Sequence, residues 1–238
     1  MRKPQSIHAL VFDVFGTVVD WRGSIIREMR AFAHARNLDL DAAAFADAWR
    51  AGYRPAMDRV RNGALPWMNI DRLHRLILDD LLEQFRIRGL KEADKIHLNQ
   101  VWHRLKPWPD SRRGLKRLKS GFVISTLSNG NVALLTNMAK NAGLPWDCVI
   151  SAELFHHYKP DLEAYRGAAE LLGLKPREVM LVAAHKDDLF AAKRAGLKTA
   201  FVRRPLENGR GVKKDLASEA GFDFNADDFL DLADQLDT

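Results

Sequence analysis

Polar side chains with catalytic potential follow four strand-like segments of this chain. The four groups are Asp13 with Thr17, Ser128 with Asn129, Lys159 with Asp161, and His185 with Asp187 and Asp188. Each group taken singly suits a helix cap, because Ser, Asn and Asp side chains hydrogen-bond free backbone N–H groups at helix starts. Four groups at one sheet edge would instead bring a carboxylate, a hydroxyl, an ammonium and a further acid to one crevice. This pattern predicts a site for nucleophilic or acid–base chemistry.

Strand-like and helical segments alternate along much of the chain and would position these groups. The expected strands are residues 7–12, 121–127, 148–150, 179–184 and 199–202, and the expected helices between them are 131–141, 162–172 and 187–195. Residues 222–236 are typical of a short strand followed by a helix that closes the core. Such alternation predicts a parallel sheet covered on both faces, with the site at the carboxyl ends of the strands.

A helical block interrupts this alternation after the first strand. From residue 24 to residue 105 the apolar side chains recur with a helical period and form four stripes. Pro55 lies inside the second stripe and is expected to kink that helix or to end its first half. The predicted fold class is therefore α/β, a Rossmann-like parallel-sheet core with an inserted all-helical cap domain. We assign residues 1–20 and 106–238 to the core and residues 21–105 to the cap.

The composition is that of a globular protein and excludes several other classes. Of the 238 residues, 47% are hydrophobic and 29% are charged, which rules out a disordered or collagen-like chain. No apolar stretch reaches the ~18–20 residues needed to span a bilayer, and no secretory signal precedes the first strand. The single cysteine, Cys148, cannot form an internal disulfide, so a cytoplasmic protein is expected.

The net charge of +6 raises the question of a nucleic-acid partner. The lysines and arginines are scattered, and acidic residues accompany most of them. We therefore predict a basic surface that steers small anions, with no nucleic-acid and no membrane partner. The oligomeric state stays open, because the six tryptophans could pack in a core or across a homodimer interface.

The four polar groups carry a specific family resemblance that spans nearly the whole chain. The segments Asp13-Val14-Phe15-Gly16-Thr17, Leu127-Ser128-Asn129, Lys159-Pro160-Asp161 and Ala183-Ala184-His185-Lys186-Asp187-Asp188 resemble the four ordered motifs of the haloacid dehalogenase superfamily. Phosphatases of that superfamily carry a second Asp two residues after the nucleophile, where this chain has Phe15. A phenyl ring cannot protonate a leaving alkoxide. The resemblance therefore implies the L-2-haloacid dehalogenase (type II haloacid dehalogenase) branch.

This resemblance implies a role for each matching residue of the core. Asp13 would attack C2 of a short 2-haloalkanoic acid, displace halide with inversion and form an ester that water hydrolyses. Thr17 would orient Asp13, and Lys159 would keep the Asp13 carboxylate ionised. Tyr165 would support this group, and Asp188 would position or activate the water.

Further residues would bind the substrate. Arg50 resembles the cap-domain arginine that receives the departing halide, although without the resemblance it is typical of a surface position on an amphipathic helix. Asn129 would lie on the halide side, Ser128 would hold the substrate carboxylate, and Phe15 would form an apolar wall. Trp67, in the loop between the second and third cap helices, is a further candidate, although such a tryptophan is more often part of a core.

The fourth segment departs from the Ser-Ser-Asn pattern of many relatives, because Ala183, Ala184 and His185 stand there. His185 could be the base that activates water, paired with Asp188, or it could fill space and shrink the pocket. A smaller pocket, with Trp67 near the cap, would favour two-carbon acids such as haloacetates, with fluoroacetate among them.

Two other functions stay open at this point. A metal-dependent phosphatase or phosphonatase of the same superfamily would use Asp187 and Asp188 for magnesium. Phe15 removes a carboxylate from that metal site, although its backbone carbonyl could still serve as a ligand. Because Lys159 and Arg50 already provide positive charge for a small substrate carboxylate, we predict neither a metal nor a cofactor. Phosphonatase chemistry would also want a Schiff-base lysine, for which the cap offers only Lys91 and Lys95. An anion-binding or nucleic-acid-binding module with a decayed site would lack catalytic residues that are present here.

Overall fold

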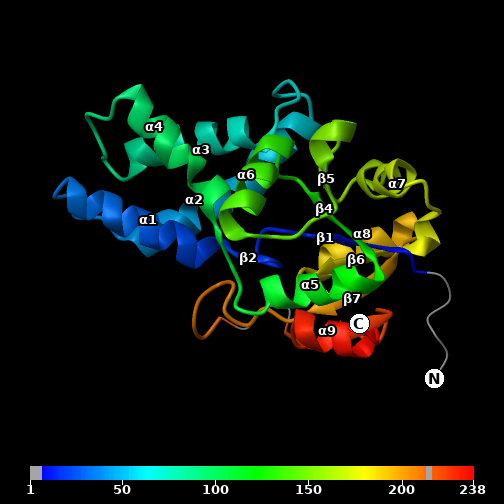
Figure 1. The fold of residues 1–238 in the computed structure, drawn as a ribbon. Helices are drawn as coiled ribbons and strands as arrows, with labels where there is room; N and C mark the ends of the chain where they lie inside the picture. Colours follow the sequence, from blue (N-terminus) through cyan, green and yellow to red (C-terminus); the bar gives the residue numbers. More distant parts are fainter. Residues whose placement is uncertain (1–6, 213–215) are drawn as a thin grey trace.

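A six-stranded parallel sheet lies at the centre of the computed structural model, which describes residues 7–212 and 216–238 (Figure 1). Its strands are β1 (Ala9–Phe12), β4 (Val123–Ser128), β5 (Cys148–Ser151), β6 (Val179–Ala183), β7 (Lys198–Val202) and β8 (Phe224–Ala226). The order is β5-β4-β1-β6-β7-β8, and every neighbouring pair is parallel. After β1 the chain first adds β4 and β5 on one side of β1, and it then adds β6, β7 and β8 on the other side. A crevice opens at such a switch point, at the carboxyl end of β1.

Alternate side chains of each strand face opposite sides of the sheet. In β1, Leu10 and Phe12 belong to one apolar cluster, and Val11 belongs to a second one. The first cluster also contains side chains of α5 (Ser111–Gly121), α6 (Val132–Ala142) and α9 (Phe229–Gln235), and the second contains side chains of α7 (Leu162–Leu171) and α8 (Lys186–Ala195). Helices therefore cover both faces, and the predicted α/β fold is confirmed.

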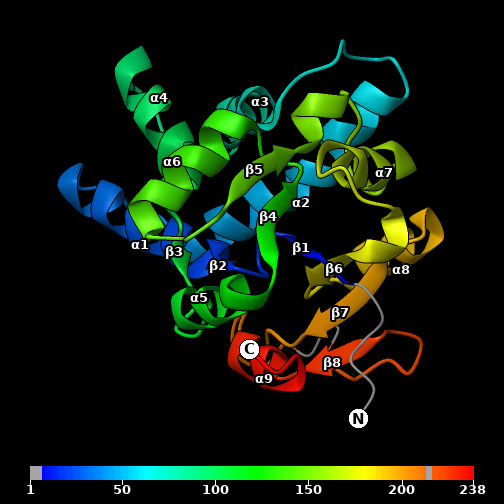
Figure 2. The ribbon, with the colours of Figure 1, turned by 45° about the vertical axis from the view of Figure 1, so that its right-hand side comes forward.

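A helical block lies between two short strands, β2 (Val19–Asp20) and β3 (Lys106–Pro107). It consists of α1 (Trp21–Ala35), α2 (Ala42–Arg61), α3 (Ile70–Gln84), α4 (Glu92–Asn99) and the 3-10 turn η1 (Gln100–Arg104). Figure 2 shows α1, α3 and α4 grouped well away from α9 and β8. Strands β2 and β3 pair antiparallel. The two points at which the chain passes between the core and the predicted cap therefore lie side by side. No helix in the described ranges combines the length and apolarity of a membrane span.

One of the two alternatives expected at Pro55 and the expected start of one strand need correction. Helix α2 does not end at Pro55 but continues to Arg61. Pro55 leaves the carbonyl of Ala51 without its helical donor, but Ala51 is exposed, so water can supply that hydrogen bond. Helix α5 was not indicated by the sequence pattern, because its buried Leu115 and Leu118 stand among lysines and arginines. It extends to Gly121, so β4 starts later than expected.

A histidine without polar partners lies in the core of the helical block. His74 of α3 is fully buried, and its ring stacks on Trp102 with a centroid distance of 4.0 Å. The rings of Phe15, Trp49 and Tyr53 surround it. Neither ring nitrogen has a hydrogen-bond partner in the part of the chain that the structure describes. Burial disfavours the charged imidazolium and lowers the pKa of His74 to about 3.

The replacement His74→Phe is expected to make the protein less sensitive to acid. Below pH 6.5 the unfolded chain protonates His74, whereas the folded protein keeps this ring neutral down to about pH 3. Stability therefore falls as the pH drops through this window, by about 2 kcal/mol between pH 7 and pH 5. Urea unfolding at both pH values measures the loss, which should shrink by that amount in the variant, whatever its stability at pH 7. An equal loss in both proteins would contradict the assignment.

Candidate active site

The carboxyl end of β1 presents Asp13 to the crevice. Oδ2 of Asp13 accepts hydrogen bonds from Oγ1 of Thr17 at 2.7 Å and from Nδ1 of His185 at 3.0 Å. Oδ1 of Asp13 accepts one from Nζ of Lys159 at 3.1 Å. Oγ1 of Thr17 also accepts from the backbone N–H of Ala184 at 2.9 Å, so its single proton points to the carboxylate. Thr17 thus lies where it can orient Asp13.

Lys159, in the loop after β5, joins two buried carboxylates. Its ammonium donates to Asp13 and also to Oδ2 of Asp188, at 2.5 Å. Burial disfavours the charged forms of Asp13, Asp188 and Lys159. For Asp13 and Lys159, the attraction between opposite charges outweighs this effect of burial. The pKa of Asp13 lies well below its usual range, and the pKa of Lys159 lies above its own. Asp13 is therefore an ionised carboxylate throughout the neutral pH range.

Asp188, in the first turn of α8, is held by two donors. Lys159 donates to one oxygen of its carboxylate, and Oη of Tyr165 donates to the other at 2.5 Å. Burial and the neighbouring charge of Asp13 raise the pKa of Asp188, although Lys159 opposes the shift. Tyr165 is fully buried and reaches this cluster through Asp188. The adjacent Asp187 is exposed at the rim of the cavity.

His185 lies between two carboxylates. Its Nδ1 is 3.0 Å from Oδ2 of Asp13, and its Nε2 is 2.9 Å from Oε1 of Glu207, which lies in the loop after β7. Burial alone would lower the pKa of His185, but these two carboxylates raise it well above its ordinary value. The pairing of His185 with Asp188 that the sequence suggested is therefore not the one that forms: Glu207 takes the place of Asp188.

Sequence reasoning missed Glu207, because it belongs to none of the four motifs. The residue is buried against Gly16, whose φ of +86° favours glycine. A Cβ atom at Gly16 would also lie 2.1 Å from Oε1 of Glu207. Nε1 of Trp21 donates to the same oxygen at 3.2 Å. Gly16 is the one sequence signal connected with this site, since its missing side chain leaves room for the carboxylate.

The end of β4 supplies a hydroxyl and an amide. Oγ of Ser128 accepts from the backbone N–H of Gly130 at 3.2 Å, and its own proton has no acceptor in the described ranges. The amide of Asn129 binds the backbone of Lys159 twice, accepting from its N–H at 2.6 Å and donating to its carbonyl at 3.2 Å. Both residues line the cavity. Asn129 thus positions Lys159, in addition to the halide contact that we predict for it.

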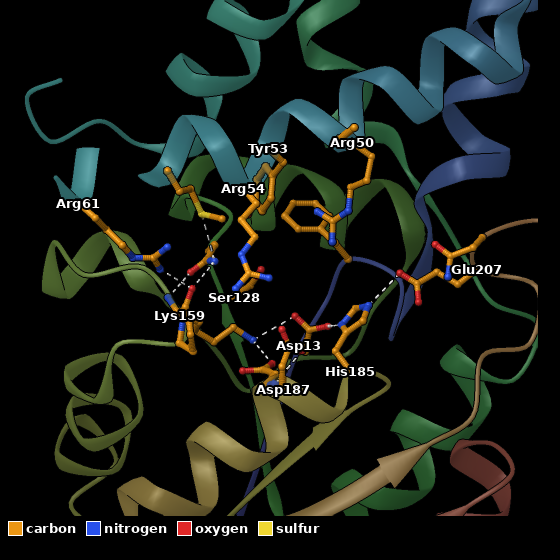
Figure 3. Close-up of a pocket in the computed structure, with 17 residues that line it drawn as sticks. Asp13, Arg50, Tyr53, Arg54, Arg61, Ser128, Lys159, His185, Asp187 and Glu207 are labelled. Carbon is orange, nitrogen blue, oxygen red and sulfur yellow. Dashed lines mark hydrogen bonds and ion pairs between the residues drawn. The ribbon is translucent and has the colours of Figure 1, made fainter. Parts of the chain in front are cut away.

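Helix α2 supplies the opposite wall of the cavity, which includes Arg50 (Figure 3). The Arg50 guanidinium lies over the rings of Tyr53, at 4.8 Å, and of Trp21, at 5.6 Å. Its Nη1 is buried without a hydrogen-bond partner among the residues described. Arg50 is therefore not a solvated surface residue but a cation held by aromatic faces, with an N–H group free to bind an anion.

Two more arginines of α2 line the cavity and were not expected from the sequence. Arg54 follows Arg50 by about one helical turn, and Figure 3 shows its guanidinium directed toward Ser128. Within residues 7–212 and 216–238, no hydrogen bond or ion pair engages Arg54. Arg61, in contrast, donates to the carbonyl of Lys159 at 2.8 Å and pairs with Asp161 at 3.3 Å. Helical spacing from Arg50 is the signal that could have identified both.

The aromatic candidates divide between the site and its surroundings. Phe15 is buried, lines the cavity and meets Trp102 edge-on at 5.6 Å, so it forms the expected apolar wall. Trp67 does not line the cavity. Its ring stacks instead on His156, at 4.3 Å, and on Tyr158, at 6.4 Å. The structure therefore places Trp67 in an aromatic cluster outside the site, which corrects the sequence-based assignment.

The cavity between α2 and the strand ends has a volume of about 590 Å³. In the described part of the chain, no three His, Cys, Asp or Glu side chains gather in a metal-binding arrangement. Asp13 and Asp188 already bind the ammonium of Lys159, and Phe15 offers no carboxylate. These donors therefore do not suit magnesium, which prefers a set of oxygen ligands.

This combination of sheet, motif order and buried Asp–Lys pair is that of the haloacid dehalogenase-like hydrolases. Residues 7–196 match that family, and the chain belongs to it. Its relatives place it in the L-2-haloacid dehalogenase branch. The (S)-2-haloacid dehalogenase 4A of Burkholderia cepacia is 30% identical over 205 residues, which cover 84% of each chain.

Solved structures show the same relationship over nearly the whole chain. The crystal structure of an L-2-haloacid dehalogenase is 50% identical, with a TM-score of 0.91, and the match covers 97% of this chain and 99% of that one. The crystal structure of a defluorinating L-2-haloacid dehalogenase is 46% identical, with a TM-score of 0.96, and the match covers 100% and 99%. The family resemblance read from the four motifs is thus confirmed.

Proposed function

We propose that the protein hydrolyses short L-2-haloalkanoic acids to 2-hydroxy acids and halide. One observation carries this proposal: the ionised Asp13 faces the cavity beside Phe15, which cannot protonate a leaving group. A halide leaves as a stable anion and needs no proton, whereas an alkoxide does. The similarity to L-2-haloacid dehalogenases supports the proposal, and the defluorinating relative supports including fluoroacetate among the substrates.

The reaction proceeds in two steps on Asp13. First, a carboxylate oxygen attacks C2 of the substrate, and the carbon–halogen bond breaks with its electron pair on the halide. This step forms an ester and inverts the configuration at C2. Second, water adds to Cγ of the ester, and the bond from Cγ to the substrate oxygen breaks. One 2-halocarboxylate and one water thus give one 2-hydroxycarboxylate, one halide and one proton.

The cations of the cavity suit a substrate that is an anion and releases another anion. Arg50 lies on the cap side, opposite Asp13, where a leaving group displaced from behind would depart. Its unpartnered Nη1 is the group that we assign to the halide. Arg54 and the hydroxyl of Ser128 are assigned to the substrate carboxylate, since both have free N–H or O–H groups facing the cavity.

Phosphatase and phosphonatase chemistry fit this cavity less well. Lys159 is the one lysine among the described residues that line it. Lys95 pairs with Asp79 at 3.0 Å on the outer part of the helical block and is not available as a Schiff base in the cavity. No observation favours either alternative over dehalogenation.

Halide release from chloroacetate, fluoroacetate and each enantiomer of 2-chloropropionate tests the function. We expect release from chloroacetate and L-2-chloropropionate, with inverted D-lactate as the product of the latter, and unchanged rates in EDTA. Fluoride release from fluoroacetate is expected to be slower, because the carbon–fluorine bond is stronger. If no halide were released from any of the four substrates, and the protein released phosphate from a generic phosphate ester in a magnesium-dependent reaction, the proposal would be overturned in favour of a phosphatase.

A further inference from the structure

We propose that His185 and Glu207 form a proton relay that serves the hydrolysis of the ester on Asp13. In this relay Nδ1 of His185 takes a proton from the attacking water. Glu207 is a positioning residue that acts through His185 by holding the proton on Nε2. The inference rests on the proposed function, because it requires an ester on Asp13.

The relay follows from what lies at the two ends of the imidazole ring. Asp13 faces Nδ1 at 3.0 Å and Glu207 faces Nε2 at 2.9 Å (Figure 3). Ionised carboxylates only accept hydrogen bonds, so both ring nitrogens must carry protons in the free enzyme. His185 is therefore an imidazolium before the reaction starts and cannot act as a base at that stage.

Glu207 is built into the site rather than drawn to it from solvent. Its carboxylate is buried, receives Nε1–H of Trp21 at 3.2 Å and packs on the bare backbone of Gly16. The His185 side chain keeps 22% of its surface exposed, on the cavity side, so water can reach it. One end of the ring is thus held firmly, and the other faces the place where an ester carbonyl would form.

Esterification of Asp13 changes the charge next to Nδ1 and leaves Nε2 untouched. The charged groups that line the cavity with His185 come from several elements. They are Asp13 after β1, Glu207 after β7, Asp187 and Asp188 on α8, Lys159 after β5, and Arg50, Arg54 and Arg61 on α2. Of these, Asp13 alone becomes neutral in the first step. The carboxylates of Glu207 and Asp13 both raise the pKa of His185, so esterification of Asp13 removes one of these two causes and lowers that pKa. In the relay, the Nδ1 proton then passes to solvent. The base is thereby created only after the ester exists.

The proton balance of this sequence closes. The imidazolium of His185 loses its Nδ1 proton to solvent when the ester forms. Nδ1 then takes a proton from water as the oxygen of that water bonds to Cγ of Asp13. The same proton passes to the oxygen of the hydroxy acid as the ester bond breaks, which leaves Asp13 as a carboxylic acid. Asp13 returns its proton to Nδ1 and restores the starting pair, so one proton is released in each turnover.

Asp188 is less suited to act as this base. Both oxygens of its carboxylate already accept hydrogen bonds, from Lys159 and from Tyr165. Protonating Asp188 would weaken its pairing with the ammonium of Lys159. In contrast, Nδ1 of His185 has Asp13 as its hydrogen-bond partner and becomes free when Asp13 is esterified.

The variant Glu207→Gln tests the relay, because it keeps the size of the side chain and removes its charge. With chloroacetate we expect a burst of one chloride per active site, followed by turnover slower by roughly 10²-fold or more. Mass spectrometry of the acid-quenched protein should then detect an ester on Asp13, which does not accumulate in the wild type. Glu219→Gln is the matched control: that carboxylate lies 3.6 Å from Lys186 and is outside the cavity.

A second readout separates a relay from simple structural support. Removing the negative charge of Glu207 lowers the pKa of His185 in the ester state, so the acid limb of ester hydrolysis should move to lower pH in Glu207→Gln. In the wild type, a pH indicator should detect one proton released with the chloride burst, before the ester is hydrolysed. Loss of packing would change neither the position of the limb nor the timing of the proton.

The outcomes separate this inference from the function on which it rests. If the wild type releases no halide, the proposed function fails, and the relay fails with it. If the wild type releases halide but Glu207→Gln shows neither a burst nor a shifted acid limb, the relay alone is overturned. If Glu207→Gln does not fold, His185→Gln decides, because it removes the base and should accumulate the same ester. Full turnover in that variant would also overturn the relay.

Discussion

Replacing Asp13 by Asn is expected to abolish halide release, with a loss of at least roughly 10⁴-fold in kcat. An amide is a far weaker nucleophile than the ionised carboxylate that Thr17, His185 and Lys159 hold in place. The NH₂ group of Asn would also face donors, so the variant loses acceptor capacity as well as charge. Single-turnover chloride release from chloroacetate measures the effect, and mass spectrometry should find no ester at residue 13.

The same chemical change on the surface serves as the control. Asp227 pairs with Arg203 at 2.8 Å, and its side chain is largely exposed. Asp227→Asn should retain the wild-type rate. A rate for Asp13→Asn within tenfold of that control would mean that another group attacks the substrate, and the two-step mechanism would have to be abandoned.

Replacing Lys159 by Met is expected to reduce both activity and stability. The change leaves the buried carboxylates of Asp13 and Asp188 without their shared cation, which should cost about 3–5 kcal/mol of unfolding free energy. Loss of this positive charge also raises the pKa of Asp13, so activity should be lost at a higher pH on acidification than in the wild type. At neutral pH we expect a loss of roughly 10²–10³-fold in kcat.

A second lysine allows the two effects to be assigned. Nζ of Lys95 lies 3.0 Å from Oδ1 of Asp79, a distance close to the 3.1 Å between Lys159 and Asp13. Unlike that buried pair, the side chains of Lys95 and Asp79 are each about one-third exposed. Lys95→Met should therefore cost about 0–1 kcal/mol and leave the pH profile unchanged. Urea unfolding and the pH dependence of chloride release compare the two variants. Equal stability losses, or an acid limb that does not move in Lys159→Met, would contradict the central role of Lys159.

Most of the fold could be predicted from local patterns. Apolar runs such as residues 7–12 mark buried strands, and the helical period of residues 24–105 marks the inserted block. Prediction failed where those patterns were weak: α5 was not expected, because it carries few apolar residues. The packing that stabilises α5 lies outside its own sequence, so no local pattern indicated that helix. Of the two alternatives expected at Pro55, the end of the helix did not occur, because water can reach the freed carbonyl.

Some residues of the candidate site could be identified from the sequence, and others could not. Residues in the four motifs were identified in advance because the order of these motifs resembles a known family, and because each motif follows a predicted strand of one parallel sheet, Lys159 at a distance of several residues. Arg54 lies on the same face of α2 as Arg50 and could have been found from that spacing. Trp67 was assigned to the site because its loop belongs to the predicted cap. A loop has no periodicity that reveals which way a side chain points, and the ring of Trp67 packs outside the cavity.

The sequence by itself determined the class of fold, the four motifs that carry the family resemblance, with Asp13 and Lys159 among them, and the absence of a second acid at Phe15. These depend on residue type and on the order of segments along the chain, which are visible without the tertiary structure. Only the tertiary structure decided that His185 pairs with Glu207 and not with Asp188, and that Asn129 clamps the backbone of Lys159. Such pairs join loops that follow different strands, so their partners depend on how those loops pack against one another, and no local pattern encodes that choice.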